Sequence, residues 1–160
     1  MTHALPKVAH EHHDLLMPHV DALAGIADSI GKIPADELAD RLASEHRFIA
    51  TRLVPHMSQA EATLYPELER LQQNRHSMTP MRREHDLIRG MIAEVDALRP
   101  RVGEFGVQFR LRRLLFRMHA LLKTHLAEEE AYLGVLEHNL SPAEEEQLAQ
   151  AMAHATAEPR

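Results

Sequence analysis

The stretch HMSQAEATLYPEL, residues 56–68, decides the fold because its pattern returns later in the chain. In HLAEEEAYL, residues 125–133, a histidine is again followed by a glutamate within about one helical turn. Glu61 corresponds to Glu130, and each segment continues with a leucine three residues after that glutamate. Residues at such spacings share one face of a helix. The repetition therefore predicts two equivalent helices, each with a histidine on its inner face.

A second repeat links the N-terminal part of the chain with its middle. HDLL, residues 13–16, matches HDLI, residues 85–88, and apolar residues follow each histidine at +3, +7 and +10. This spacing keeps one helix face turned inward over three turns. The chain therefore reads as a pair of helices followed by a variant of the same pair.

Helical patterns dominate, and we find no convincing alternating strand. Pro55 and Pro66 are expected to bend the second helix. Short loops between long helices predict an all-α, antiparallel up-down-up-down four-helix bundle with a short C-terminal fifth helix. We expect a single domain over residues 1–160, with its core at about 8–150 and a frayed end at 155–160. The expected helices cover residues 6–30, 35–72, 79–99 and 107–138, followed by a short helix that a capping box opens at Ser141.

Composition excludes several classes of protein. The chain has 160 residues and no cysteine, which rules out disulfides, zinc fingers and iron–sulfur clusters. Its net charge is −6 without a dense basic run, so we expect no nucleic-acid partner. It has neither an apolar run of about 20 residues nor a signal-peptide pattern. We therefore expect a cytoplasmic protein with no membrane partner.

Histidine is unusually frequent, with 13 copies, and one lies on the inner face of each long helix. An antiparallel bundle brings such positions to a similar height, with glutamates of the second and fourth helices beside them. Imidazole and carboxylate together suit borderline metals such as iron and manganese. Buried charged glutamates without a metal or partners would cost roughly several kcal/mol. The pattern therefore predicts a metal site inside the bundle.

These pieces resemble the hemerythrin-like, HHE cation-binding family, over residues from about 8 to 150. That family carries a histidine on each of four helices, and often a leucine–aromatic–proline end such as Leu64-Tyr65-Pro66. The resemblance implies a non-haem di-iron centre, oxo- or hydroxo-bridged, that binds or senses small oxidants: dioxygen, peroxide or nitric oxide. The metal ligands that we expect are His13, His56, Glu61, His85, His125 and Glu129.

The second helix departs from the family pattern. The usual glutamate four residues after the histidine would fall at Ala60, and Glu61 stands at +5 instead. On a regular helix, +4 lies about 40° from the histidine and +5 about 140°. Glu61 therefore reaches a metal only if a bulge, or the bend near Pro55, turns it inward.

Two ligand assignments stay open at this point. On the fourth helix, the geometry of a regular helix favours Glu129, whereas the internal repeat favours Glu130. On the first helix, His12 is the substitute for His13 because it lies on an overlapping apolar stripe.

Oxygen-carrying hemerythrins have a fifth histidine four residues after the third-helix one, and Arg89 occupies that position here. The resemblance therefore implies a four-histidine site with an open or altered iron. Ala60 and Arg89 also motivate an alternative, a mononuclear or metal-free helical bundle that acts as an interaction module. A third hypothesis is a weak peroxidase- or catalase-like activity at the same site, although no separate acid–base pair supports it.

Other polar residues have two interpretations each. His19 and His119 are expected either to orient ligands by hydrogen bonding or to be structural. Tyr65 and Tyr132 are expected to line the site or to lie at the core edge. The remaining histidines are expected at the surface: His3, His10, His46, His76, His138 and His154.

Overall fold

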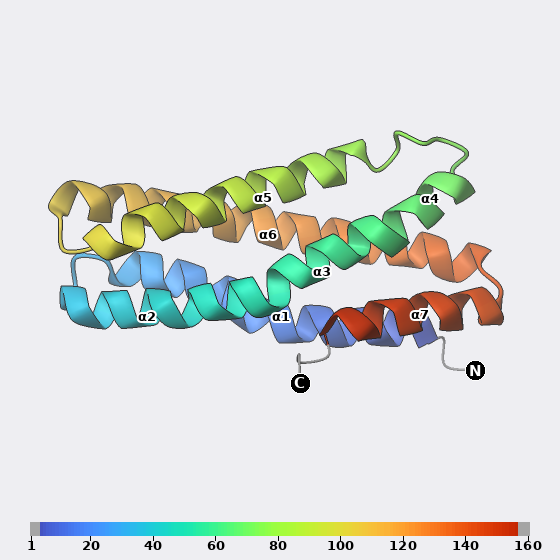
Figure 1. The fold of residues 1–160 in the computed structure, drawn as a ribbon, viewed down its shortest axis with the longest axis horizontal. Helices are drawn as coiled ribbons and strands as arrows, with labels where there is room; N and C mark the ends of the chain where they lie inside the picture. Colours follow the sequence, from blue (N-terminus) through green and yellow to red (C-terminus); the bar gives the residue numbers. More distant parts are fainter. Residues whose placement is uncertain (1–3, 157–160) are drawn as a thin grey trace.

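The computed structural model describes the backbone of residues 4–156 and the side chains of residues 8–153, and that part of the chain is all-helical, without a strand. In Figure 1 the long helical segments lie along the long axis of the molecule, and the C-terminal helix returns beside the N-terminal one. His3, the side chain of His154 and the last residues of the end predicted to fray lie outside the described residues. The elements are α1 (Ala4–Ser29), α2 (Ala35–Phe48), η1 (Ile49–Leu53), α3 (Val54–Gln59), η2 (Ala60–Leu64), α4 (Tyr65–Leu71), α5 (Thr79–Leu98), η3 (Arg99–Arg101), α6 (Phe105–Asn139) and α7 (Pro142–Thr156).

The predicted second helix is continuous over residues 35–71, from α2 to α4, with two π-helical turns in it. We call this whole segment the rod. Each π turn stands directly before a proline: η1 ends two residues before Pro55, and η2 ends two residues before Pro66. Proline has no amide hydrogen, and its ring clashes with the carbonyl one turn back in an α-helix. A wider turn accommodates the ring, so the helix continues with a local change of winding. By contrast, α1 continues through Pro18 as a single element.

Local signals account for the connections. Gly31 has φ +82° in the turn between α1 and α2, a conformation that glycine adopts without strain. The capping box forms as predicted: the Ser141 amide donates to Glu144 at 2.8 Å, and the Glu144 amide lies 3.4 Å from the Ser141 hydroxyl. Helix α7 therefore begins at the expected place and then packs along α1 and α3. Within residues 4–156, no helix combines the length and apolarity that a membrane crossing requires.

The core is divided into two apolar clusters. One includes Leu16, Met57 and Ile88, and the other joins α4 and α7 to the neighbouring parts of α1, α5 and α6. Each long helical segment has buried histidine between residues of the two clusters, as His12 and His13 lie between Ala9 and Leu16 on α1. The sequence therefore places a polar layer across the interior of the bundle.

Candidate metal centre

Four imidazoles from four helices meet in this polar layer around one carboxylate. They and Glu129 are buried, and Glu129 itself is only 2% exposed. We call this set the His–Glu cluster: His13 of α1, His56 of α3, His85 of α5, and His125 and Glu129 of α6.

The two oxygens of Glu129 face two different histidine pairs. Its Oε2 lies 3.0 Å from Nε2 of His56 and 3.2 Å from Nε2 of His13. Its Oε1 lies 3.6 Å from Nε2 of His125, whose Nε2 is in turn 2.9 Å from Nε2 of His85. Each pair together with Glu129 offers ligand atoms within 4.8 Å of one another. The cluster can therefore hold metal at two positions that share one carboxylate.

Helix geometry explains why Glu129 joins the cluster and Glu130 does not. His125 and Glu129 are four residues apart on α6, so both side chains leave the same face. Glu130 lies one residue further round the helix, with its side chain 33% exposed. Its carboxylate accepts from Nδ1 of His13 at 2.7 Å and also contacts His10 at 3.0 Å. The residue that the internal repeat favours therefore lies behind a histidine of the cluster.

Three carboxylates surround the cluster in this way. Besides Glu130 on His13, Glu61 accepts from Nδ1 of His85 at 2.6 Å, and Glu84 accepts from Nδ1 of His125 at 2.8 Å. When Nδ1 carries the donated proton, the other ring nitrogen, Nε2, is the one available to a metal. Such outer partners fix ring orientation and raise the basicity of the ligand.

Glu61 shows the effect of the altered winding of the rod. A glutamate at +5 from His56 needed a wider turn to face inward, and the π-helical turn η2, which begins at Ala60, is such a turn. Glu61 reaches the rim of the cluster, where its side chain is 29% exposed and binds both His85 and Arg89, the latter at 3.0 Å. The structure does not bring it into either metal-binding group. Ala60, at +4, is fully buried in the apolar core.

The electrostatics of the cluster depend on Glu129. Burial alone would raise its pKa, but attraction to His56 and hydrogen bonds from His125 and His13 outweigh that effect and hold the pKa well below the usual value. Burial lowers the pKa of His13, yet hydrogen bonds to Glu129 and Glu130 raise it overall. The pKa of His125 is likewise raised, with burial opposing and contacts to Glu129 and Glu84 prevailing.

These shifts also test whether the residues fit a metal. Without one, the hydrogen bonds of His13 to Glu129 and Glu130 favour its protonated ring, and its pKa rises although burial opposes the charge. A metal ion can replace such protons because it accepts the lone pairs of the same nitrogens, and binding then releases protons. Four imidazoles and one buried carboxylate are a donor set for borderline first-row metals. The residues present therefore fit a metal centre.

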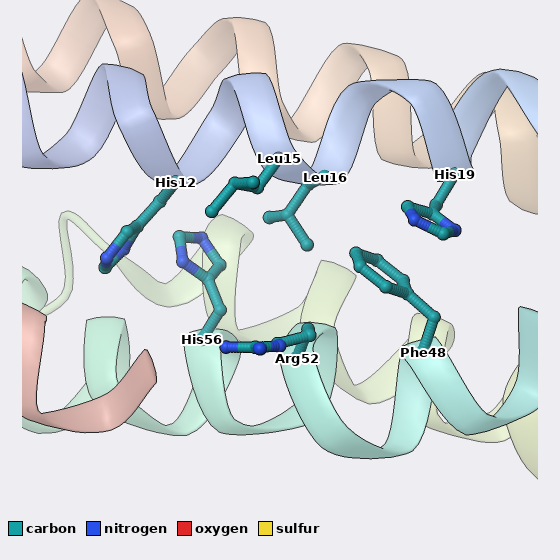
Figure 2. Close-up of a pocket in the computed structure, with 7 residues that line it drawn as sticks. All are labelled: His12, Leu15, Leu16, His19, Phe48, Arg52 and His56. Atoms are coloured by element: carbon teal, nitrogen blue, oxygen red, sulfur yellow. The ribbon is translucent and has the colours of Figure 1, made fainter. Parts of the chain in front are cut away.

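His13, rather than its neighbour His12, belongs to the cluster. His12 is also buried, but its ring lies edge-on to the His56 ring, with the ring centroids 6.0 Å apart, and it is in neither group of candidate ligands. Burial and repulsion from His56 and His13 lower its pKa from 6.5 to about 4. His12 instead lines a cavity between α1 and the rod from α2 to α4 (Figure 2).

Tyr65 lines the site, which is one of the two positions that the sequence allowed for it. Its hydroxyl donates to Oε1 of Glu129 at 2.9 Å and lies 3.1 Å from Nε2 of His85. Glu84 is a contact that sequence reasoning missed. Glu84 directly precedes His85, but its partner is His125 on another helix. The only signal in the sequence was that Glu84 is an acidic residue next to a predicted ligand.

The other histidines have structural contacts. His19 stacks on Phe48 and contacts Glu45 at 2.8 Å, and His119 contacts Asp21 at 3.2 Å. His46 was expected at the surface, but it is half-buried and lies beside Asp96. The other surface histidines whose side chains are described are exposed: His10, His76 and His138.

One of three comparisons with known proteins gave a match. A family model described as the hemerythrin HHE cation binding domain matches residues 5–134, which contain every member of the His–Glu cluster. Neither the curated proteins nor the solved structures gave a significant match. Because the family model covers most of the 160 residues, the chain belongs to the hemerythrin HHE cation-binding family.

Proposed function

We propose that the His–Glu cluster holds two iron ions and that the protein binds or senses a small oxidant: dioxygen, peroxide or nitric oxide. His13 and His56 would hold one ion and His85 and His125 the other, and Glu129 belongs to both groups of candidate ligands. The observation that carries the proposal is that the two oxygens of one buried carboxylate face separate histidine pairs. A bridging carboxylate between imidazole pairs is the chemistry expected of a di-metal site in a helical bundle.

The proposal includes an antiparallel, up-down-up-down order for the four long segments. Figure 1 supports it, because short connections join segments that lie side by side along the long axis. The packing of α1 and α5 on α6 supports it too. With this order, ligands near the middle of each segment converge without long crossovers.

Iron would supply open coordination positions for a small oxidant, since each position has few protein ligands. The chain supplies the surroundings. The two apolar clusters on either side exclude water, which strengthens electrostatic interactions inside. Tyr65 presents a hydroxyl donor at Oε1 of Glu129, and Glu130, Glu61 and Glu84 orient the histidines.

Metal analysis tests the proposal directly. Protein expressed in iron-replete medium is expected to contain about two iron ions per chain and to show near-ultraviolet charge-transfer absorption. Glu129→Ala is expected to lose both ions, whereas Glu128→Ala, at an exposed neighbouring position, is the matched control and keeps them. Iron-free protein from iron-replete cells, or full iron content in Glu129→Ala, would refute the proposal.

One observation favours the alternative, a mononuclear or metal-free interaction module. Glu61 is already bound by His85 and Arg89, so a second carboxylate is withheld from the centre. The alternative predicts one metal ion per chain or none, together with a melting temperature that chelation leaves unchanged. The di-iron proposal predicts that chelation lowers the melting temperature, because a ligand bound only to the folded state stabilises it.

A further inference from the structure

The side of α6 that faces solvent carries most of the phenylalanines of the chain. α6 packs against α1 and α5, and away from them Phe105 is 89% exposed and Phe109 is 61% exposed. Phe116, two turns after Phe109, lies on the same side and is half-buried. The sequence has only four phenylalanines, so three of them lie along this face. Large apolar residues gathered on an exposed face usually mark a contact with a partner.

Arginines accompany these rings. The guanidinium of Arg112 lies over the Phe116 ring at 5.8 Å, and that of Arg113 lies over the Phe109 ring at 5.9 Å. Such contacts hold a cation and an aromatic face together. Arg110 is also exposed, so the N-terminal half of the outward face is both bulky and positively charged.

Five turns later the same face is small and acidic. Because five turns of an α-helix take about 18 residues, segments 109–116 and 127–134 present their side chains in the same directions. The first segment reads FRLRRLLF and the second AEEEAYLG. The corresponding residues on the outward face are Phe109 with Ala127, Arg110 with Glu128, Arg112 with Glu130, Arg113 with Ala131, and Phe116 with Gly134. Each ring is therefore matched by a small residue, and two of the three arginines by glutamates.

Packing within the chain does not explain the glycine in the second segment. A methyl group at Gly134 would meet no atom within 4 Å, and glycine destabilises a helix relative to alanine. Ala127 and Ala131 are also exposed. Small residues along one face leave room for the bulky side chains of another helix, because the distance between packed helices depends on the side chains at the contact.

The charged residues lie along the two edges of the face. On the N-terminal half, Arg110 pairs with Glu94 of α5 at 2.9 Å, and Arg112 lies 3.7 Å from Asp28 of α1. Both pairs are largely exposed, and a guanidinium has donors left for a second carboxylate.

The C-terminal half has the opposite charge on the same two edges. Glu128 lies on the α5 edge, where Glu84 is its neighbour, and Glu130 lies on the α1 edge beside His13. α6 therefore carries arginine at the start of each edge and glutamate further along it.

Two copies of α6 in antiparallel orientation bring these unlike halves together. Segment 109–116 of one copy then lies against segment 127–134 of the other, so rings meet small side chains. A twofold axis keeps each edge of the helix on the same side of the pair, so Arg110 faces the edge that carries Glu128 in the second copy. A parallel pair would instead oppose like charges, which is unfavourable.

We propose that the protein forms a twofold-symmetric dimer through the outward faces of two antiparallel α6 helices. This interface lies outside the His–Glu cluster and does not depend on metal. α6 has 35 residues. A helix of that length is about 50 Å long and 10–12 Å wide, so the pair buries roughly 1,000–1,200 Å² in total, at the lower end of specific interfaces. The dimer is therefore expected to dissociate on dilution.

Sedimentation equilibrium over a range of protein concentrations measures the association, on the full chain as purified and again after chelation. Wild type is expected to reach twice the mass of one chain in both forms. Phe109→Arg is expected to weaken the dimer about tenfold or more, because it replaces an aromatic anchor by a charge. Leu87→Arg is the matched control, since Leu87 is 56% exposed but lies on α5, and it should leave the association unchanged. Circular dichroism confirms that each variant is folded.

Exchanging charges tests the pairing of the edges. Arg110→Glu and Glu128→Arg should each weaken the dimer, because each places like charges opposite one another across the interface. The double variant restores opposite charges at the same place and should recover the association.

Cross-linking tests the antiparallel order. The chain has no cysteine, so a single engineered one reports its own surroundings. Ala120→Cys, exposed near the middle of α6, should be linked to its copy by a short bismaleimide. Phe105→Cys should not, because its two copies lie roughly 45–50 Å apart in an antiparallel pair.

Several outcomes would overturn the dimer. They are sedimentation as a monomer at millimolar concentration, equal weakening by Leu87→Arg, no recovery in the double charge exchange, and efficient cross-linking of Phe105→Cys. A monomer that sediments with phosphatidylserine vesicles would also overturn it, because a lipid surface would then cover this face. Iron content is no part of these readouts, so failure here is distinct from failure of the di-iron proposal.

Discussion

Replacing Glu129 with glutamine isolates the role of the one carboxylate at the middle of the bundle. The substitution keeps the size of the side chain and removes its charge. In the metal-free protein, Glu129 accepts from Tyr65 and contacts the Nε2 atoms of His13 and His56 within 3.2 Å. Glutamine at this position removes the buried negative charge that raises the pKa of His13 against the effect of burial.

The magnitude follows from burial. Removing one partner of a buried ion pair costs about 3–5 kcal/mol, because the remaining charge stays desolvated. The same change at Glu130, whose side chain is 33% exposed, should cost about 1 kcal/mol at most. For a chain of this size, about 2–4 °C of melting temperature accompanies each kcal/mol, so Glu129→Gln should melt roughly 6–20 °C below the wild type.

Urea denaturation followed by circular dichroism, in the presence of a chelator and after metal analysis shows no bound metal, gives the free energy of unfolding. Wild type, Glu129→Gln and Glu130→Gln should be measured together at one pH. A loss below about 1 kcal/mol in Glu129→Gln would refute the reasoning. So would an equal loss in both variants, because the burial of Glu129 would then not matter.

Three further outcomes are expected. The pKa of His12 is lowered from 6.5 to about 4, so its neutral ring stabilises the metal-free protein above pH 6.5, and this contribution is lost as the pH falls toward 4. His12→Gln should therefore flatten the fall in unfolding free energy between pH 6.5 and 4. An identical fall in both proteins would contradict this. Glu84→Ala should lower metal affinity about 10–100-fold in competition with a chromophoric chelator, because His125 loses its outer partner, and unchanged affinity would argue against that role. Tyr65→Phe should lower the unfolding free energy of the metal-free protein by about 1.5–3 kcal/mol through the lost hydrogen bond to Glu129, and denaturation showing no loss would contradict it.

Local patterns in the sequence were sufficient for the helices and for most of the cluster. The expected helix at 107–138 is observed as Phe105–Asn139, and the one at 79–99 as Thr79–Leu98 followed by a short 3₁₀ turn. Each of the four histidines lies on a buried face because apolar residues at helical spacing surround it. Glu129 follows from the same rule, since its four-residue spacing from His125 is a property of one helix.

The position of Glu61 could be predicted only in part. The sequence showed that a +5 glutamate needs a wider turn, and the structure has one at Ala60–Leu64. Where the carboxylate then lies depends on α5, which presents His85 and Arg89 to it. Those two partners are distant in sequence, so periodicity along one helix carries no information about their contact.

The amino-acid sequence by itself determined where the helices run and that each long helix carries a histidine on its inner face, because both follow from periodicity within a single helix. It left open the choice between His12 and His13 and between Glu129 and Glu130. Only the tertiary structure decided that the two oxygens of Glu129 face separate histidine pairs and that Glu61, Glu84 and Glu130 bind the outer nitrogens of those rings. Nearly all of these contacts join different helices, and their geometry depends on how the helices pack and rotate against one another. The physical reason is that a helix sets the direction of its own side chains, whereas packing sets what those side chains meet.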